Sequence, residues 1–521
     1  MNLLWFKLSN WCRRVWYVLA EGVITMVMQL KTNGIKEDTK MKKNYFAFIT
    51  LAFVFAACTN KIDVPGVYTM TVNAVKGEVG DLNTRALALD ETTSPHQLNA
   101  TWVAGEVVEV YQSGAKIGEL TAAASASTST TLSGSFASVP SSSADLTFYF
   151  HSNADPAYAG QDGTLATIAS TYDFCAPATV TVGNFTVDDV NKEIDVPGGI
   201  SFGANQQAIV KFTLKQSDGS ALPSNPTSLT IYSTGIISLE SIPAATFTAN
   251  GNCVLFVALP GISSRPVKLV ATVGSDKYIY EKSGVTFADG SYYEIPVKMK
   301  LVPEDAIVGF FSVSDTRKVY FSKGNLNYVS ATGSYKFADA QKDYMGESQT
   351  DGFDMFSWDG YSYDAVRPWW RLSRDQWVYL FLTRSVTNTL SDGAHYTMAK
   401  VGGVNGLIIF PDIYTHPEGT GFVSGSFDEA SNYTASVNDA GWAKMEAAGC
   451  VFLPAAGWKT GGGTWKQVGL EVSYSSSTEG GGYYGIYYDY YCIWFRPEGV
   501  DLYDHPDKST WTAVRLVQTA E

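Results

Sequence analysis

The feature that most constrains the fold is a series of short segments, between residues 67 and 302, in which apolar and polar residues alternate. Clusters of Ser, Thr, Gly and Ala separate these segments, and no apolar pattern of helical period is sustained in this half of the chain. Many short strands divided by turn residues are typical of β-sandwiches, and a region of this length suffices for two. We therefore predict one sandwich over 67–195 and a second over 196–302. The clearest strand segments are 68–75, 107–111, 146–150, 208–214, 228–232 and 253–259.

A different pattern begins after a linker at 303–305. Ser373, followed three residues later by Gln376, is a capping-box signature for the start of a helix. A second helix is expected to stop at Gly449, because glycine adopts the left-handed conformation after a helix at low cost. Short apolar strands lie on both sides of this second helix. We predict an α+β domain over 303–521, within a chain whose fold class is mainly β.

The N-terminal region predicts export. A short basic segment at 41–43 precedes an apolar run over 45–57, which is too short to span a bilayer and has the length of a signal-peptide core. Small residues stand directly before Cys58, as in the bacterial lipobox, where the cysteine thiol is acylated. We therefore predict a lipoprotein signal peptide over 41–57, lipidation of Cys58, a lipidated linker over 58–66, and a location on the outer membrane at the cell surface. An ordinary signal peptide with an incidental cysteine is the alternative.

Residues 1–40 combine tryptophans with a mixed apolar and basic pattern. We interpret them as a mis-called upstream extension, with Met41 as the true start. A genuine interfacial helix is the alternative interpretation.

Charge and cysteine content narrow the class of protein. The formal net charge of −14 argues against a nucleic-acid partner, since such proteins need basic patches. With Cys12 and Cys58 set aside, Cys175, Cys253, Cys450 and Cys492 remain, in no close spacing. Four cysteines allow three pairings, and isolated buried thiols are an equally good interpretation.

Several short motifs in residues 41–300 resemble the fimbrillin-like family, the lipoprotein-derived pilins of type V pili. They are the lipobox, residues 84–87 (TRAL), residues 98–102 (LNATW) and a closing strand at 290–297. The resemblance implies two tandem transthyretin-like sandwiches and assembly with other pilin-like subunits by strand exchange. In pilins of this family an arginine-specific protease removes the first strand, and Arg85 stands where such a cut would fall. A solvated residue at a strand end is the alternative interpretation of Arg85.

The C-terminal region resembles the "major paralogous domain" of secreted bacterial proteins, which is itself similar to the formylglycine-generating enzyme fold and to C-type lectins. The resemblance rests on the order of six motifs. These are 324–326 (GNL), 370–372 (WRL), 404–409 (VNGLII), 452–457 (FLPAAG), 474–477 (YSSS) and 514–517 (VRLV). It implies a C-type lectin-like α+β domain that binds a ligand.

The sequence offers little for catalysis or metal binding. Enzymes of the formylglycine-generating type use reactive cysteines near their C-terminal strands, whereas Cys450 and Cys492 stand among apolar and aromatic residues. We therefore predict that the chain is not an enzyme and needs no cofactor. Calcium is a weak possibility in one acidic loop, where the alternative is ordinary solvated carboxylates. The loop contains Glu498, Asp501, Asp504 and Asp507.

Aromatic residues gather in two glycine-rich stretches, and rings in such loops bind sugars or proteins. We predict that the C-terminal domain binds a glycan or a host protein, and that the chain is a cell-surface adhesin or a pilus tip or accessory subunit. A structural stalk or anchor subunit without a specific ligand is the first alternative, and a formylglycine-generating-like enzyme is the second. The candidate ligand-binding residues are Trp358, Trp369, Trp370, Tyr483, Tyr484, Tyr487, Tyr488 and Tyr490.

Overall fold

The computed structural model divides the chain into two compact units, Met1–Val67 and Tyr68–Glu521. Apart from Val67, every residue that the structure describes belongs to the second unit. The described residues are 67–75, 88–90, 97–99, 101–123, 127–136, 140–150, 156–203, 205–248, 250–329, 334–344, 369–429, 432–460, 465–479, 490–504 and 510–520. Within these ranges, no helix has the length and apolar character needed to cross a membrane.

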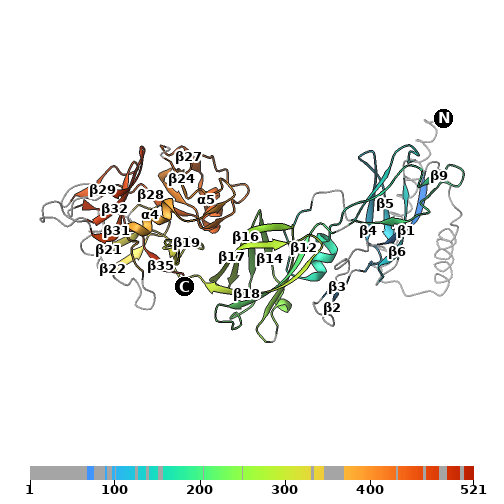
Figure 1. Ribbon diagram of the computed structural model, residues 1–521, viewed down its shortest axis with the longest axis horizontal. Helices are drawn as coiled ribbons and strands as arrows, with labels where there is room; N and C mark the ends of the chain where they lie inside the picture. Colours follow the sequence, from blue (N-terminus) through green and yellow to red (C-terminus); the bar gives the residue numbers. More distant parts are fainter. Residues whose placement is uncertain are drawn as a thin grey trace, which may run out of the picture. The chain divides into compact units, whose positions relative to one another are not determined.

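The first β-rich body is one nine-stranded sheet with the order β8-β7-β4-β5-β6-β1-β10-β9, in which β11 also pairs with β1 (Figure 1). Its strands alternate as predicted: β1 buries every second residue. Residues from β1, β4, β6 and β7 share one hydrophobic cluster, so the sheet must fold over a common core. The strands are β1 (Tyr68–Val75), β4 (Val107–Gln112), β5 (Ala115–Ala122), β6 (Ser129–Phe136), β7 (Leu146–Phe150), β8 (Ala178–Val180), β9 (Thr186–Asp188), β10 (Glu193–Asp195) and β11 (Ile200–Ser201). A separate hairpin joins β2 (Ala88–Asp90) and β3 (Gln97–Asn99).

Trp102 occupies the centre of this first core and is fully buried. Its ring meets Phe150 edge to face at 5.6 Å between centroids, a favoured aromatic geometry. The body extends slightly past the predicted boundary at residue 195. Ile200 pairs with Ala74 of β1 in parallel, so the chain leaves the first sheet only after β11.

The second β-rich body is a seven-stranded sheet with the order β14-β13-β16-β17-β18-β12-β15. β12 runs parallel to β18 and antiparallel to β15, and β16 and β17 form the longest hairpin of the body. Register shifts beside Arg265 interrupt that hairpin. The elements are β12 (Ala208–Gln216), β13 (Ser228–Tyr232), β14 (Ile236–Glu240), η2 (Ala244–Thr246), β15 (Cys253–Leu259), β16 (Ile262–Val273), β17 (Asp276–Phe287) and β18 (Tyr292–Leu301).

The crossover between β7 and β8 contains the short helices α3 (Leu165–Thr167) and η1 (Ile168–Tyr172). It precedes β8 of the first sheet in the chain but packs on the second: Ile168 and Tyr172 lie in a cluster with residues of β12 and β15. Gln161 donates to and accepts from the backbone of Ala258, at 2.9 and 2.8 Å. The sequence shows no helical period here, because α3 and η1 are too short to repeat one. The Thr164 side chain caps the start of α3.

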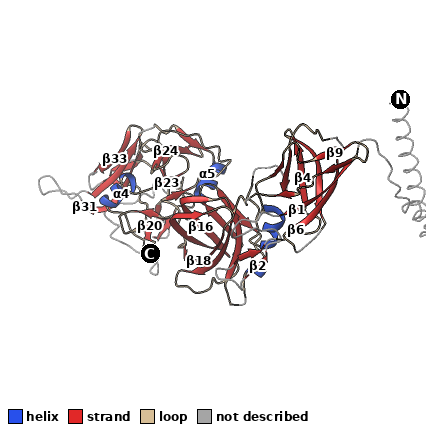
Figure 2. Ribbon diagram, turned by 45° about the vertical axis from the view of Figure 1, so that its right-hand side comes forward, coloured by secondary structure: helices blue, strands red, loops and turns tan. Residues whose placement is uncertain are grey.

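In its described residues the C-terminal domain is α+β, with two helices and several small sheets (Figure 2). Both helix predictions are confirmed: α4 (Arg374–Leu382) begins with the Ser373–Gln376 capping box, and α5 (Asp439–Ala447) ends just before Gly449, whose φ is +103°. The four-stranded sheet has the order β27-β24-β25-β28, and three-stranded sheets join β19-β20-β35, β30-β29-β34 and β31-β32-β33.

The strands of this domain are mostly short. They are β19 (Phe311–Ser312), β20 (Lys318–Phe321), β21 (Leu326–Val329), β22 (Ser334–Phe337), β23 (Thr387–Asn388), β24 (Tyr396–Val401), β25 (Val404–Ile409), β26 (Ile413–Tyr414), β27 (Ala435–Val437), β28 (Val451–Pro454), β29 (Trp458–Thr460), β30 (Trp465–Lys466), β31 (Val472–Glu479), β32 (Tyr490–Arg496), β33 (Gly499–Asp504), β34 (Thr510–Trp511) and β35 (Val517–Thr519).

The capping box yields a stability prediction. Ser373→Ala removes the acceptor for the Gln376 N–H, so we expect the free energy of unfolding to fall by about 1 kcal/mol in chemical denaturation. Ser477→Ala changes an exposed serine of the same domain and serves as the control, with no measurable loss expected. Equal stability of the two variants would contradict a role for the cap.

Candidate functional site

The first strand, β1, lies in the interior of its sheet. It pairs antiparallel with β6 over its whole length, from Tyr68 opposite Phe136 to Val75 opposite Ser129. On its other side it pairs in parallel with β10 and with β11. Both backbone edges of β1 are therefore hydrogen-bonded within the sheet, although it is the first described strand of the chain.

The alternate side chains of β1 that point into the core explain why this strand lies in the interior of the sheet. Tyr68, Met70, Val72 and Ala74 are all at most 2% exposed and belong to the core of the first body. Removal of β1 would expose a row of core side chains, together with unpaired backbone groups on β6, β10 and β11. Another strand with the same alternation would satisfy both.

Side-chain contacts hold the start of β1. The Tyr68 hydroxyl donates to the carboxylate of Asp189, and the Lys192 ammonium donates to that hydroxyl at 3.2 Å. The same ammonium lies 5.1 Å from the centroid of the Tyr68 ring, within cation–π range. The Thr69 N–H also donates to the Lys192 carbonyl at 2.9 Å. The residues before β10 therefore fix the N-terminal end of the strand.

The predicted lipidation site and the predicted cleavage site, Cys58 and Arg85, lie outside the described residues. So do Trp358, Tyr483, Tyr484, Tyr487 and Tyr488 of the predicted aromatic face, and Asp507 of the acidic loop. These assignments stay predictions.

The two described tryptophans of the first aromatic stretch have different environments. Trp369 is 2% exposed and meets Phe337 edge to face at 5.0 Å, so it belongs to the core and cannot present a ring to a ligand. Sequence reasoning placed it in a loop, but its partner in the β21–β22 hairpin is distant along the chain. Trp370 is partly exposed, and the Arg317 guanidinium lies 5.6 Å from its ring centroid.

In the second aromatic stretch, Tyr490 is the first residue of β32 and pairs with Glu479 of β31. Its neighbour Tyr491 is partly exposed and lies under the Arg374 guanidinium, 4.7 Å from the ring centroid. Tyr503 of β33 lies 5.8 Å from the same guanidinium and is 56% exposed. Arg374, Tyr491 and Tyr503 form an accessible group that we call the aromatic cluster.

The acidic candidates do not form a recognisable cation site. Glu498 is exposed in the turn between β32 and β33, and Asp501 accepts the Tyr503 N–H at 2.9 Å. Asp504 pairs across the sheet with Cys492. Among the residues that the structure describes, no three His, Cys, Asp or Glu side chains gather closely enough to hold a metal.

The four described cysteines are all buried and none forms a disulfide. Cys450 and Cys492, the pair that a formylglycine-generating enzyme would require, are 0% and 1% exposed. Burial raises the pKa of the Cys450 thiol above its ordinary value. A thiol in such surroundings stays protonated and is a poor nucleophile.

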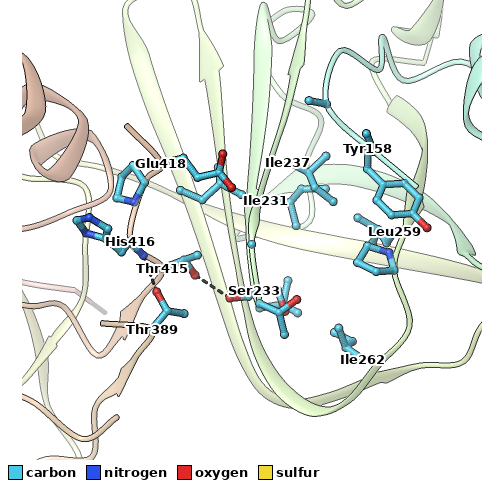
Figure 3. Close-up of a pocket in the computed structure, with 18 of the residues that line it drawn as sticks. Tyr158, Ile231, Ser233, Ile237, Leu259, Ile262, Thr389, Thr415, His416 and Glu418 are labelled. Atoms are coloured by element: carbon cyan, nitrogen blue, oxygen red, sulfur yellow. Dashed lines mark hydrogen bonds between the residues drawn. The ribbon is translucent and has the colours of Figure 1, made fainter. Parts of the chain in front are cut away.

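A cavity of about 710 Å³ lies between the second β-rich body and the C-terminal domain (Figure 3). Ile231, Ile237, Leu259 and Ile262 give it an apolar floor. Tyr158 of the β7–β8 crossover also lines it, and Figure 3 shows this ring facing the strands of the second body.

The C-terminal wall of the cavity is polar, and the Thr415 and His416 side chains in it are hydrogen-bonded. The Thr415 hydroxyl donates to the Ser233 carbonyl at 2.8 Å, as Figure 3 shows. His416 has the Tyr414 hydroxyl and the Thr420 hydroxyl at its two ring nitrogens, each at 2.8 Å. Burial lowers the pKa of His416, which keeps the imidazole neutral near pH 7. Thr415 therefore joins the two bodies, and we find no nucleophile–base pair among these side chains.

Three features of these sites are absent from the sequence-based predictions: Tyr503, Arg374 and the cavity. Tyr503 was passed over because it stands outside both aromatic-rich stretches, although an aromatic residue in an acidic, charged segment is a usable signal. Arg374 stands between Ser373 and Gln376, a segment that the sequence marks only as the start of a helix. No sequence pattern predicts the cavity, since its lining residues come from segments far apart in the sequence.

No family model matches the sequence, and no curated protein matches it. The solved structures that are similar include a "putative cell adhesion protein" from Bacteroides uniformis, with 17% identity and a TM-score of 0.22 over 47% of this chain and 99% of that one. A fimbrial assembly protein from Parabacteroides distasonis has 9% identity and a TM-score of 0.23, over 52% and 99%. A "putative cell adhesion protein" from Bacteroides fragilis has 14% identity and a TM-score of 0.25, over 45% and 96%. At such low identities and TM-scores, the matches say nothing about what this chain binds.

The different environments of Trp369 and Tyr503 can be checked by measuring the free energy of unfolding of their alanine variants. Trp369→Ala opens a core cavity, and we expect it to lower the free energy of unfolding by about 3–5 kcal/mol. Tyr503→Ala removes an exposed ring, and we expect a change within about 0.5 kcal/mol. Chemical denaturation measures both, and a small loss for Trp369→Ala would mean that its ring is not part of the core.

Proposed function

We propose that this chain is a cell-surface lipoprotein subunit that assembles with pilin-like subunits by strand exchange and carries a ligand-binding C-terminal domain. The observation that carries the proposal is the interior position of β1, since this strand can be lost only if another strand replaces it. Arg85 follows β1 in the chain, so a cut there would separate Tyr68–Val75 from the rest of the body.

The energetic argument rests on the contacts of β1. Without this strand, the backbone groups on β6 and on β10 and β11 that face it would lose their partners. A buried unpaired backbone group costs about 1–3 kcal/mol, so the opened sheet would strongly favour a donor strand. An extended segment with apolar residues at every second position would fill the positions of Met70 and Val72 and restore both rows of hydrogen bonds.

The strand-exchange proposal is tested by cutting the chain. We expect an arginine-specific protease to convert the purified full chain from a monomer into multimers that resist detergent at room temperature. Arg85→Ala should remain monomeric, because β1 stays covalently attached. A synthetic peptide of Tyr68–Val75, added in excess, should cap the opened sheet and block assembly. Cleaved protein that stays monomeric without the peptide would contradict the proposal.

We also propose that the C-terminal domain binds a glycan or a host protein, which would make the chain an adhesin or a tip or accessory subunit. The aromatic cluster supports this role, since exposed rings stack on the apolar faces of sugars and anchor protein interfaces. A structural stalk or anchor subunit remains the alternative, in which this surface has no ligand. We further propose that the chain has no catalytic role of the formylglycine-generating type, which the burial of Cys450 and Cys492 supports.

A glycan array probed with the full chain, with and without calcium, separates the adhesin from the structural subunit. If a ligand binds, we expect Tyr503→Ala to weaken its affinity about tenfold, the effect of losing one stacked ring. Leu382→Ala, which truncates a side chain that is 60% exposed on α4, is the matched control and should bind normally. Binding to no glycan, and to no host protein in a parallel screen, would favour the structural role.

A further inference from the structure

The outer face of the second sheet carries a cross-strand pair of charged residues that the C-terminal domain covers. Lys268 of β16 lies directly opposite Glu281 of β17, and Tyr232 of β13 lies opposite Lys268 on its other side. Lys268 is fully buried, and the Glu281 side chain is only 4% exposed. The next row of the same face, Val270 and Ile279, is buried as well.

This face shares one hydrophobic core with the C-terminal domain. Tyr232, Val270 and Ile279 belong to the same cluster as Trp442 and Phe452. Among the described residues, four hydrogen bonds join the two bodies beside this core. They run from Lys268 Nζ to the Ala448 carbonyl (2.6 Å), from Tyr232 OH to the Ala447 carbonyl (3.3 Å), from Lys300 Nζ to the Ala520 carbonyl (2.9 Å) and from Thr415 Oγ1 to the Ser233 carbonyl (2.8 Å). We call this contact the joint.

Lys268 is well accommodated in the joint. Its ammonium donates to the C-cap residue of α5, where the helix dipole favours a cation. It also lies 4.3 Å from the centroid of the Tyr232 ring. Burial lowers the pKa of Lys268, while the charge of Glu281 opposes this decrease. The lysine therefore keeps two favourable contacts even without the Glu281 charge.

Glu281 is poorly accommodated. Within the described residues, neither of its carboxylate oxygens has a hydrogen-bond partner within the usual distance. Lys318 Nζ of the C-terminal domain forms an ion pair with Oε2, but at 3.7 Å it is too far away for a good hydrogen bond. Lys318 is itself 3.1 Å from Asp412, which also binds the buried Arg384 at 3.0 Å. The charge of Glu281 also acts on Tyr320, whose buried hydroxyl has no hydrogen-bond partner among the described residues.

These surroundings determine the charge that Glu281 prefers. Burial raises the pKa of the Glu281 carboxyl above its ordinary value; Lys268 and Lys318 oppose this rise, and Asp412 adds to it. A carboxyl with a raised pKa weakens the docked state only when it is ionised. The docked state begins to lose stability as the pH rises past the ordinary pKa of a carboxyl group. This loss is complete once the pH exceeds the raised pKa of Glu281.

We propose that the joint is a proton-controlled lock, in which uptake of one proton by Glu281 fixes the C-terminal domain to the second β-rich body as a single arm. Below neutral pH the neutral carboxyl removes a buried charge whose oxygens accept no hydrogen bond among the described residues, and the joint tightens. At higher pH the ionised carboxylate loosens it. This proposal does not depend on strand exchange or on ligand binding, and a failure of either leaves it standing.

Glu281→Gln tests the lock, because it mimics the protonated carboxyl at every pH. Among the tryptophans after residue 67, only Trp102 lies outside the C-terminal domain, so tryptophan fluorescence reports mainly the unfolding of that domain. We expect Glu281→Gln to raise the midpoint of thermal unfolding of the full chain by about 3–6 °C at about pH 8, and by much less at about pH 5. An effect on this signal must pass through the joint, since Glu281 lies in the second body.

Glu294→Gln is the matched control, because Glu294 is a more exposed carboxylate of the same sheet, paired with Lys211 at 3.1 Å. It should shift the midpoint equally at both pH values. Infrared difference spectra of the wild-type chain give a second measurement, in which the band of a protonated buried carboxyl appears on acidification and is absent from Glu281→Gln. A Glu281→Gln shift that is the same at both pH values, or the absence of that band, would overturn the proposal.

Discussion

The β-rich part of this structure depends on one constraint, that a buried backbone N–H or carbonyl must have a hydrogen-bond partner. β1 meets it by pairing on both sides, with β6 over its whole length and with β10 and β11 in parallel. β15 stands at the end of its sheet, and there the crossover takes the place of a strand. The Phe256 N–H donates to the Gly163 carbonyl at 2.8 Å. The Gln161 amide donates to the Ala258 carbonyl and accepts from the Ala258 N–H. A strand that is removed must therefore be replaced, which is why strand exchange suits this architecture.

The same constraint governs the charged side chains of the C-terminal domain. Arg515 is 1% exposed, and its guanidinium donates to Gln341 Oε1 at 2.6 Å and to the Phe452 carbonyl at 2.7 Å. Arg384 is likewise buried and is paired with Asp412. Glu281 differs from them because it is buried without a hydrogen-bond partner among the described residues. A protein interior tolerates such a group most easily in its neutral form, so the least satisfied charge at the joint is also the one that responds to pH.

Several elements were predictable because their causes lie within a few residues. The capping box of α4 needs only Ser373 and Gln376, and the end of α5 needs only a glycine that tolerates positive φ. The candidate site was less predictable. Trp369 was expected at a ligand surface but packs on Phe337, a partner that no local pattern specifies. The aromatic cluster unites α4 with β32 and β33, and only part of it lies in an aromatic-rich stretch.

By itself the sequence determined the strands, the two helices and the change from a β-rich to an α+β region, because alternation and capping act over short distances. The tertiary structure alone decided which sheet faces are covered. Lys268 and Glu281 alternate with core residues along β16 and β17, as solvent-exposed charges do, yet they are buried because the C-terminal domain lies on that face. It also decided that the crossover before β8 packs on the second sheet. A strand's own residues specify that one face is apolar, but what covers the other face depends on contacts between segments far apart in the chain.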